Sequence, residues 1–98
     1  MNGSDTPEQM KNELYEAIAK TGSPEKVKEL LDDLCTFKEI EQMAQRLRAA
    51  KLLSEGMTYN EVIEQTDISS ATLSRVSRCV HYGKGYSSLF KNKTKKTK

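Results

Sequence analysis

The stretch that decides the fold is Met57–Arg78, M-T-Y-N-E-V-I-E-Q-T-D-I-S-S-A-T-L-S-R-V-S-R. Thr58 and Glu61 have the spacing of a capping box, which predicts a short helix over about residues 59–65. After a turn at residues 66–69, Ser69 or Ser70 can cap a second helix that runs to about residue 82. Two capped helices joined by a short turn are the layout of a helix-turn-helix, which we place at about residues 58–82.

The second helix of this pair has two chemically distinct faces. Its apolar face is formed by Leu73, Val76 and Val80. Its polar face carries Ser74, Arg75, Arg78 and His81. At the end of this helix, Tyr82 and Tyr86 flank the glycines that break the chain, and we expect both to pack rather than to stack on bases. A helix fits the DNA major groove, and in a helix-turn-helix the N-terminal residues of the second helix approach the base edges. We therefore expect the following residues to bind DNA: Ser69, Ser70, Ala71, Thr72, Ser74, Arg75, Arg78 and Lys84.

The charge of the chain is unevenly distributed. The formal net charge is +2, yet residues 1–67 carry a net charge of −6 and residues 68–98 carry +8 with no acidic residue. The change of sign falls within the turn of the helix-turn-helix. A basic segment of this kind indicates a polyanionic partner.

Outward from this motif, the rest of the chain is predicted to be helical, with about six helices and no strand. Residues 1–7 form an N-terminal arm, and residues 91–98, which hold only Lys, Thr and Asn, form a disordered basic tail. Apolar residues at helical spacing predict helices over residues 8–20, 24–35 and 37–54, and a short last helix or turn is expected over residues 86–90. The third helix has a predicted buried stripe of Ile40, Met43, Ala44, Leu47 and Ala50. We expect one all-α domain over residues 1–90.

Composition excludes several classes of protein. The 98 residues contain one His, and the two cysteines, Cys35 and Cys79, are far apart with no CxxC spacing. We expect both thiols to be free and buried in a reducing, cytoplasmic compartment, and we expect no metal site. No apolar run is long enough to span a membrane. The sequence offers no cluster of a nucleophile and a base, so it gives no indication of an enzyme.

Residues 34–80 resemble the Trp operon repressor family, and most closely its smaller, Trp-repressor-related members in bacteria. The matching segments are Leu34-Cys35-Thr36, Gln45-Arg46-Leu47-Arg48 ahead of Leu52-Leu53, Gly56-Met57-Thr58, and Ala71-Thr72-Leu73-Ser74-Arg75. One departure is Asp67, where many helix-turn-helix motifs have glycine. The resemblance implies an intertwined homodimer that presents two recognition helices to successive major grooves, roughly 34–36 Å apart.

The resemblance also implies a pocket for L-tryptophan, the family's corepressor, between the recognition helix and the central helix of the partner subunit. The matching positions are Thr36, Arg46, Thr72, Arg75, Val76 and Cys79. In the repressors a glycine occupies the position of Val76 and a serine that of Cys79. A valine fills space at a position built for close approach, and a thiol is a weak hydrogen-bond partner. We therefore expect no cofactor, and we expect Arg46 and Arg75 to serve DNA phosphates or surface ion pairs.

These observations predict a sequence-specific DNA-binding transcription regulator, most simply a repressor that occupies an operator. Two alternatives stay open. The chain could be a protein-interaction adaptor that keeps the helix-turn-helix as a scaffold, or a repressor that responds to tryptophan.

Overall fold

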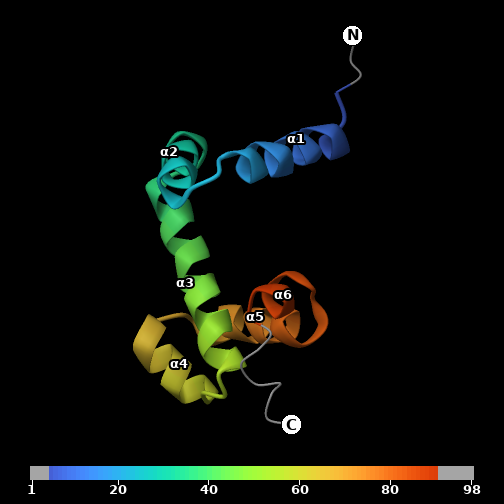
Figure 1. Ribbon diagram of the computed structural model, residues 1–98. Coiled ribbons are helices and arrows are strands. Elements are labelled where there is room, and N and C mark those ends of the chain that lie inside the picture. The colour runs from blue at the N-terminus through green and yellow to red at the C-terminus, as the bar shows by residue number, and fades with distance from the viewer. Residues whose placement is uncertain (1–4, 91–98) are drawn as a thin grey trace. The chain divides into compact units, whose positions relative to one another are not determined.

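The computed structural model describes residues 5–90 and contains six α-helices (Figure 1). The helices are α1 (Pro7–Lys20), α2 (Pro24–Leu34), α3 (Phe37–Ser54), α4 (Tyr59–Thr66), α5 (Ser70–Tyr82) and α6 (Gly85–Phe90). No strand occurs between residues 5 and 90. The all-helical prediction is therefore confirmed, and the helix limits lie within one or two residues of those expected.

Side-chain caps explain why the helices begin where they do. The Thr36 N–H donates to Glu39 Oε1 at 2.8 Å while the Glu39 N–H donates to Thr36 Oγ1 at 3.0 Å. The Thr58 and Glu61 pair makes the same reciprocal contacts. Each box satisfies two backbone groups at a helix start or just before it. The Thr58 and Glu61 box was predicted from its spacing, and Thr36 and Glu39 have the same spacing.

A third capping box was missed. Thr6 caps α1 together with Gln9, and Pro7 occupies the first helical position. The prediction of an arm over residues 1–7 is therefore wrong for Thr6 and Pro7, which belong to the helix start. The signal was the T-x-x-Q spacing, in which glutamine takes the place of glutamate.

The chain divides into two compact units at the Ile40/Glu41 boundary. In the first unit, neither α1 nor α2 contains a buried residue. Lys28 and Asp32 form an ion pair of 2.8 Å on the solvated face of α2, and this hydrogen bond raises the pKa of Lys28. The single domain expected over residues 1–90 stays a prediction, and the basic segment 91–98 lies outside the described residues.

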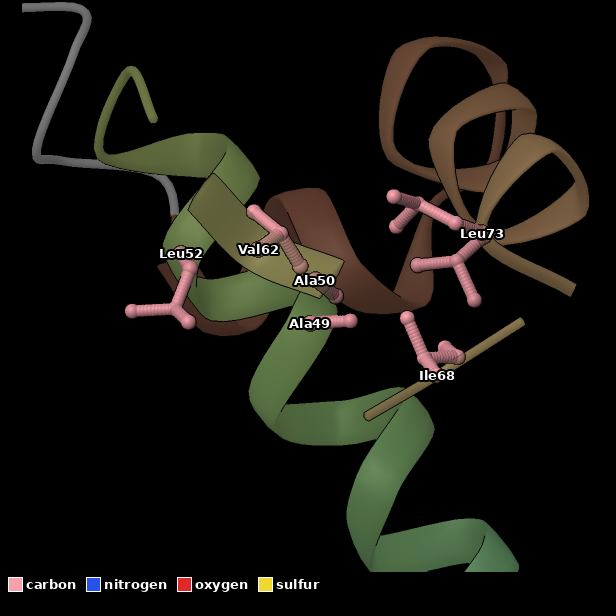
Figure 2. Close-up of a cluster of buried hydrophobic side chains, with 7 residues drawn as sticks. Ala49, Ala50, Leu52, Val62, Ile68 and Leu73 are labelled. Atoms are coloured by element: carbon pink, nitrogen blue, oxygen red, sulfur yellow. The ribbon is translucent and has the colours of Figure 1, made fainter. Parts of the chain in front are cut away.

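The second unit holds the hydrophobic core, which is built from three helices and one turn residue (Figure 2). Its buried members are Ala49, Ala50, Leu52, Val62, Ile68, Leu73 and Val76. The two alanines are fully buried, so α3 offers a flat surface to which α4 and α5 can approach closely. Tyr86 and Phe90 of α6 pack against the same cluster.

The predicted buried stripe of α3 requires a correction. Of its five residues, only Ala50 is buried and Ile40 is half-buried. Met43, Ala44 and Leu47 are exposed, although Met43 and Leu47 are large and apolar. Helical periodicity correctly identified an apolar stripe, but this chain alone does not cover it.

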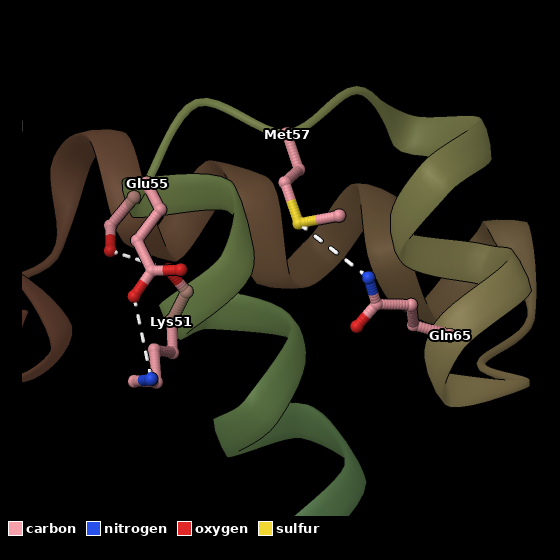
Figure 3. A network of polar contacts seen from close by, with 5 residues as sticks. Lys51, Glu55, Met57 and Gln65 are labelled. Carbon is pink, nitrogen blue, oxygen red and sulfur yellow. Dashed lines mark hydrogen bonds and ion pairs between the residues drawn. The ribbon is translucent and has the colours of Figure 1, made fainter.

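The link from α3 to α4 is a compact turn (Figure 3). Gly56 has φ 95°, and the N–H groups of Gly56 and Met57 donate to Leu53 O and Leu52 O. This pair of hydrogen bonds ends the helix at a residue in the left-handed conformation, which glycine adopts without a steric cost. Lys51 and Glu55 form an ion pair of 3.4 Å, and Gln65 Nε2 lies 4.0 Å from Met57 Sδ (Figure 3).

Candidate nucleic-acid interface

Helices α4 and α5 and the turn between them form the predicted helix-turn-helix. Helix α4 ends where the Asp67 N–H donates to Ile63 O at 2.8 Å, and Asp67 then takes a left-handed conformation with φ 63°. Asp is among the few non-glycine residues that tolerate this conformation. The following Ile68 is 2% exposed and lies in the core. The departure at Asp67 therefore leaves the turn intact.

The turn is also fastened to α3 by a contact that sequence patterns did not indicate. Gln45 Nε2 donates to the Thr66 carbonyl at 2.9 Å, across 21 positions of the chain. Thr66 in addition donates its hydroxyl to Val62 O at 2.8 Å and accepts the Ile68 N–H at 3.3 Å. Thr66 thus joins α3, α4 and the turn at one point.

The start of α5 is capped by Ser69. The Thr72 N–H donates to Ser69 Oγ at 3.1 Å, and Ser69 Oγ donates to Thr72 Oγ1 at 3.0 Å. The Ser69 hydroxyl is therefore engaged within the helix, and its first role is structural. Ser70 and Ala71 are exposed and Thr72 is half-buried. The Thr72 hydroxyl keeps its own proton for an outside acceptor.

The two faces of α5 are those that the sequence predicted. Leu73 and Val76 are 0% and 2% exposed and face the core. The polar side chains on the other face are exposed: Ser74, Arg75, Arg78 and His81. Helix α5 contains no acidic residue, and no ion pair found between residues 5 and 90 involves an arginine. The positive end of the helix dipole and two free guanidinium groups therefore lie on one helix, an arrangement suited to a polyanion.

The end of α5 differs in part from expectation. His81 is exposed and donates from Nδ1 to Ser77 O at 2.9 Å, and Lys84 is exposed in the link to α6. Tyr86 packs on the core as predicted. Tyr82 was expected to pack as well, but it is 84% exposed and that prediction is wrong.

The positions matched to the family's ligand pocket have varied environments. Thr36, in the first unit, caps α3, Arg46 is half-buried and Arg75 is exposed. The Val76 side chain is buried in the core, so it does not border an open site.

Cys79 was expected to be buried, but it is exposed, and Cys35 is only half-buried. Cys79 borders an open cavity of about 500 Å³ between α3, α5 and α6. The other lining residues are Leu47, Gly83, Gly85, Tyr86 and Leu89. The lining is mainly apolar and holds no charged side chain, so it offers no clamp for the charged groups of an amino acid.

Two further observations concern other classes of site. Across residues 5–90, no three His, Cys, Asp or Glu side chains gather in a way that could hold a metal ion. In the same part of the chain, no helix has the length and apolar content needed to cross a membrane.

Comparisons with known proteins agree on one family. The chain matches the family model described as Trp repressor protein over residues 9–94. It is 38% identical over 86 residues to the uncharacterized protein YerC of Bacillus subtilis (strain 168), a match that covers 88% of this chain and 83% of YerC. It is also similar to the crystal structure of a TrpR-like protein from Eubacterium eligens ATCC 27750, with a TM-score of 0.80 and 37% identity. That match covers 85% of this chain and 87% of the other.

Proposed function

The chain belongs to the Trp repressor family, whose fold is a DNA-binding one, and we propose that it is a sequence-specific transcription regulator. In this proposal it binds double-stranded operator DNA as a homodimer and represses by occupying the operator. The observation that carries the proposal is the outer face of α5, which is exposed, basic and free of acid.

In this proposal, some residues of this face contact bases and others contact phosphates. Ser70, Ala71, Thr72 and Ser74 are short enough for the helix start to approach base edges, and their hydroxyls and methyls suit direct readout. Arg75 and Arg78 extend toward phosphates, as does Lys84 beyond the helix end. Ser69 holds the first turn of α5, which brings the backbone N–H groups there within reach of a phosphate.

The proposed homodimer is supported by the apolar side chains that one chain leaves uncovered. Phe37 is 78% exposed, and Leu34 and Met10 are more than half exposed. Leu34 and Phe37 lie three positions apart in the chain, and an exposed apolar patch on a small protein marks an interaction site. A second copy of the chain would cover this surface and double the number of recognition helices, which raises affinity for a two-part site.

The direct test is in vitro selection of bound DNA from a random pool, followed by footprinting of the enriched sequence. We expect one enriched sequence with two related half-sites about one helical turn apart. Light scattering on the same sample should give the mass of a dimer. A monomer, or a pool without enrichment, would refute the proposal.

Substitutions separate the two kinds of contact. Thr72→Val removes a hydroxyl at nearly constant volume and should change the preferred sequence. Ser88→Ala, which removes an exposed hydroxyl on α6, is the control and should leave the preference unchanged. Removing residues 91–98, which contain five lysines, should weaken binding to all DNA about equally and flatten the salt dependence. Loss of sequence preference alone on tail removal would contradict this division.

We propose further that L-tryptophan is not required for DNA binding. Val76 occupies the position of the family's glycine and its side chain is in the core, while Cys79 replaces a serine. Calorimetry with tryptophan should give no binding heat, and DNA affinity should be unchanged by the amino acid. Micromolar binding that raises DNA affinity would establish the tryptophan-responsive alternative instead.

The adaptor alternative predicts a different result. A protein that keeps the helix-turn-helix only as a scaffold would show no salt-dependent DNA binding even at low ionic strength. The exposed arginines of α5 disfavour this alternative, because an exposed basic face without acidic residues has no role in a scaffold.

A further inference from the structure

We propose that Gln45 is a positioning residue for DNA recognition, because its amide fixes the turn of the helix-turn-helix on α3 and thereby sets the orientation of α5. Its hydrogen bond to the Thr66 carbonyl is 2.9 Å long and partly buried. Among the side-chain hydrogen bonds found in residues 5–90, no other joins positions more than eight apart. This inference rests on the DNA-binding function proposed above.

The acceptor of this bond is a group that α4 cannot satisfy by itself. The last carbonyls of a helix have no intrahelical N–H partner. The N–H that a continued helix would offer to the Thr66 carbonyl is that of Ser70, which lies beyond the end of α4. Within residues 5–90 no backbone N–H is found bonded to this carbonyl, so it is left for an outside donor. Gln45 supplies that donor from the middle of α3.

The path from Gln45 to the proposed DNA-contacting residues is short. Thr66 is followed by Asp67 in its left-handed conformation, by buried Ile68, and by Ser69, which caps α5. These three residues have fixed conformations and no slack between them. A shift at Thr66 therefore moves the start of α5 as well.

A small tilt of α5 produces a large displacement of its first residue. Helix α5 has 13 residues and is therefore about 20 Å long. A tilt of about 10° around its C-terminal end would move its first residue by roughly 3 Å. Base-edge hydrogen bonds depend on distances of 2.7–3.2 Å, so such a shift would break them. Contacts to phosphates through long, flexible Arg and Lys side chains would survive it.

The apolar contacts of the turn do not replace this bond. Ile68, Leu73 and Val76 fix how deeply the motif sits on the alanines of α3, but apolar contacts are non-directional. A hydrogen bond has a preferred direction as well as a distance. We therefore assign the depth of the motif to the core and its angle to Gln45.

The test uses Gln45→Met, which keeps the side-chain length and removes the donor. Gln42→Met is the matched control, since Gln42 is an exposed glutamine on the same helix. Gln45→Glu, which keeps the shape and replaces the donor by an acceptor, is a second variant in case methionine prevents folding. Each full-length protein is measured at a temperature where circular dichroism shows it to be folded. The readout is affinity for the sequence that the wild-type protein selects, divided by affinity for random DNA.

We expect Gln45→Met and Gln45→Glu to lower this ratio by about tenfold, the equivalent of one directed hydrogen bond, with an unchanged salt dependence. The Gln42→Met ratio should equal that of the wild type. An unchanged ratio in the Gln45 variants would overturn the inference, even if their thermal stability fell, because it would leave Gln45 with a purely structural role. An equal loss in Gln42→Met would also overturn it. If the wild-type protein selects no sequence, the proposed function itself fails.

Discussion

The exposed apolar side chains of α1, α2 and α3 predict that folding is coupled to association. In one chain α1 and α2 bury no residue, while Met10, Tyr15, Leu34 and Phe37 are each more than half exposed. Isolated helices of this length are marginal in water without tertiary packing. We therefore expect the folded chain to persist only as a dimer, and we expect dilution to lower its Tm.

The size of this effect follows from the size of the folded part. Unfolding entropy near 60 °C is about 2.1 cal/mol/K per residue, so residues 5–90 of two chains give roughly 0.36 kcal/mol/K. Tenfold dilution of a dimer costs about 1.4 kcal/mol. The quotient is a fall in Tm of about 4 °C for each tenfold dilution.

Thermal unfolding followed by circular dichroism at three concentrations, each tenfold apart, measures this slope. Leu14→Asp replaces an exposed apolar side chain of α1 by a charged one and should lower the Tm and the mass observed by light scattering. Glu13→Asp, which introduces the same residue at an exposed position beside it, is the control and should keep the mass of the wild type. A Tm independent of concentration would refute the coupling of folding to association.

Three further predictions concern the core and the helix ends. Val76→Ala removes two methyl groups from a side chain that is 2% exposed and should lower the free energy of unfolding by about 2–3 kcal/mol in urea titrations, whereas no loss would place the side chain outside the core. Gly83→Ala would place a Cβ 2.7 Å from the Cys79 carbonyl oxygen and should cost about 1–3 kcal/mol by the same measurement. Its control, Gly85→Ala, meets no atom within 4 Å and should be nearly neutral, so equal effects would contradict the steric account. Asp67→Gly removes the steric cost of the left-handed conformation but increases the conformational entropy of the unfolded chain, and the free energy of unfolding should rise by about 0.5 kcal/mol. A decrease would show that the Asp67 carboxylate itself stabilises the turn.

The features that sequence predicted well are local ones. A capping box is a pair of reciprocal hydrogen bonds between residues three positions apart. Thr36 with Glu39 and Thr58 with Glu61 could therefore be found by their spacing. The inner face of α5 was also predictable, since Leu73 and Val76 recur at helical spacing and meet a core. The helix-turn-helix could therefore be located before its structure was known.

The features that sequence did not predict depend on distant parts of the chain or on other molecules. The bond from Gln45 to Thr66 spans 21 positions and has no local pattern. Periodicity placed Met43 and Leu47 on a buried stripe, but it does not say whether the same chain supplies the surface that would bury them, and in this chain both are exposed. Cys79 was assigned to the interior by its residue type, although it is exposed and lies at the edge of a cavity.

The separation of the two faces of α5 has a consequence for protein engineering. Its buried members are Leu73, Val76 and Ser77, and the core constrains no other residue of the helix as strongly. Ser70, Ala71, Ser74, Arg75 and Arg78 can therefore be randomised together in a library without disturbing the scaffold, since exposed substitutions usually change stability by no more than about 0.5 kcal/mol. Under the proposed DNA-binding function, new sequence preferences could then be selected in one step on an otherwise constant protein.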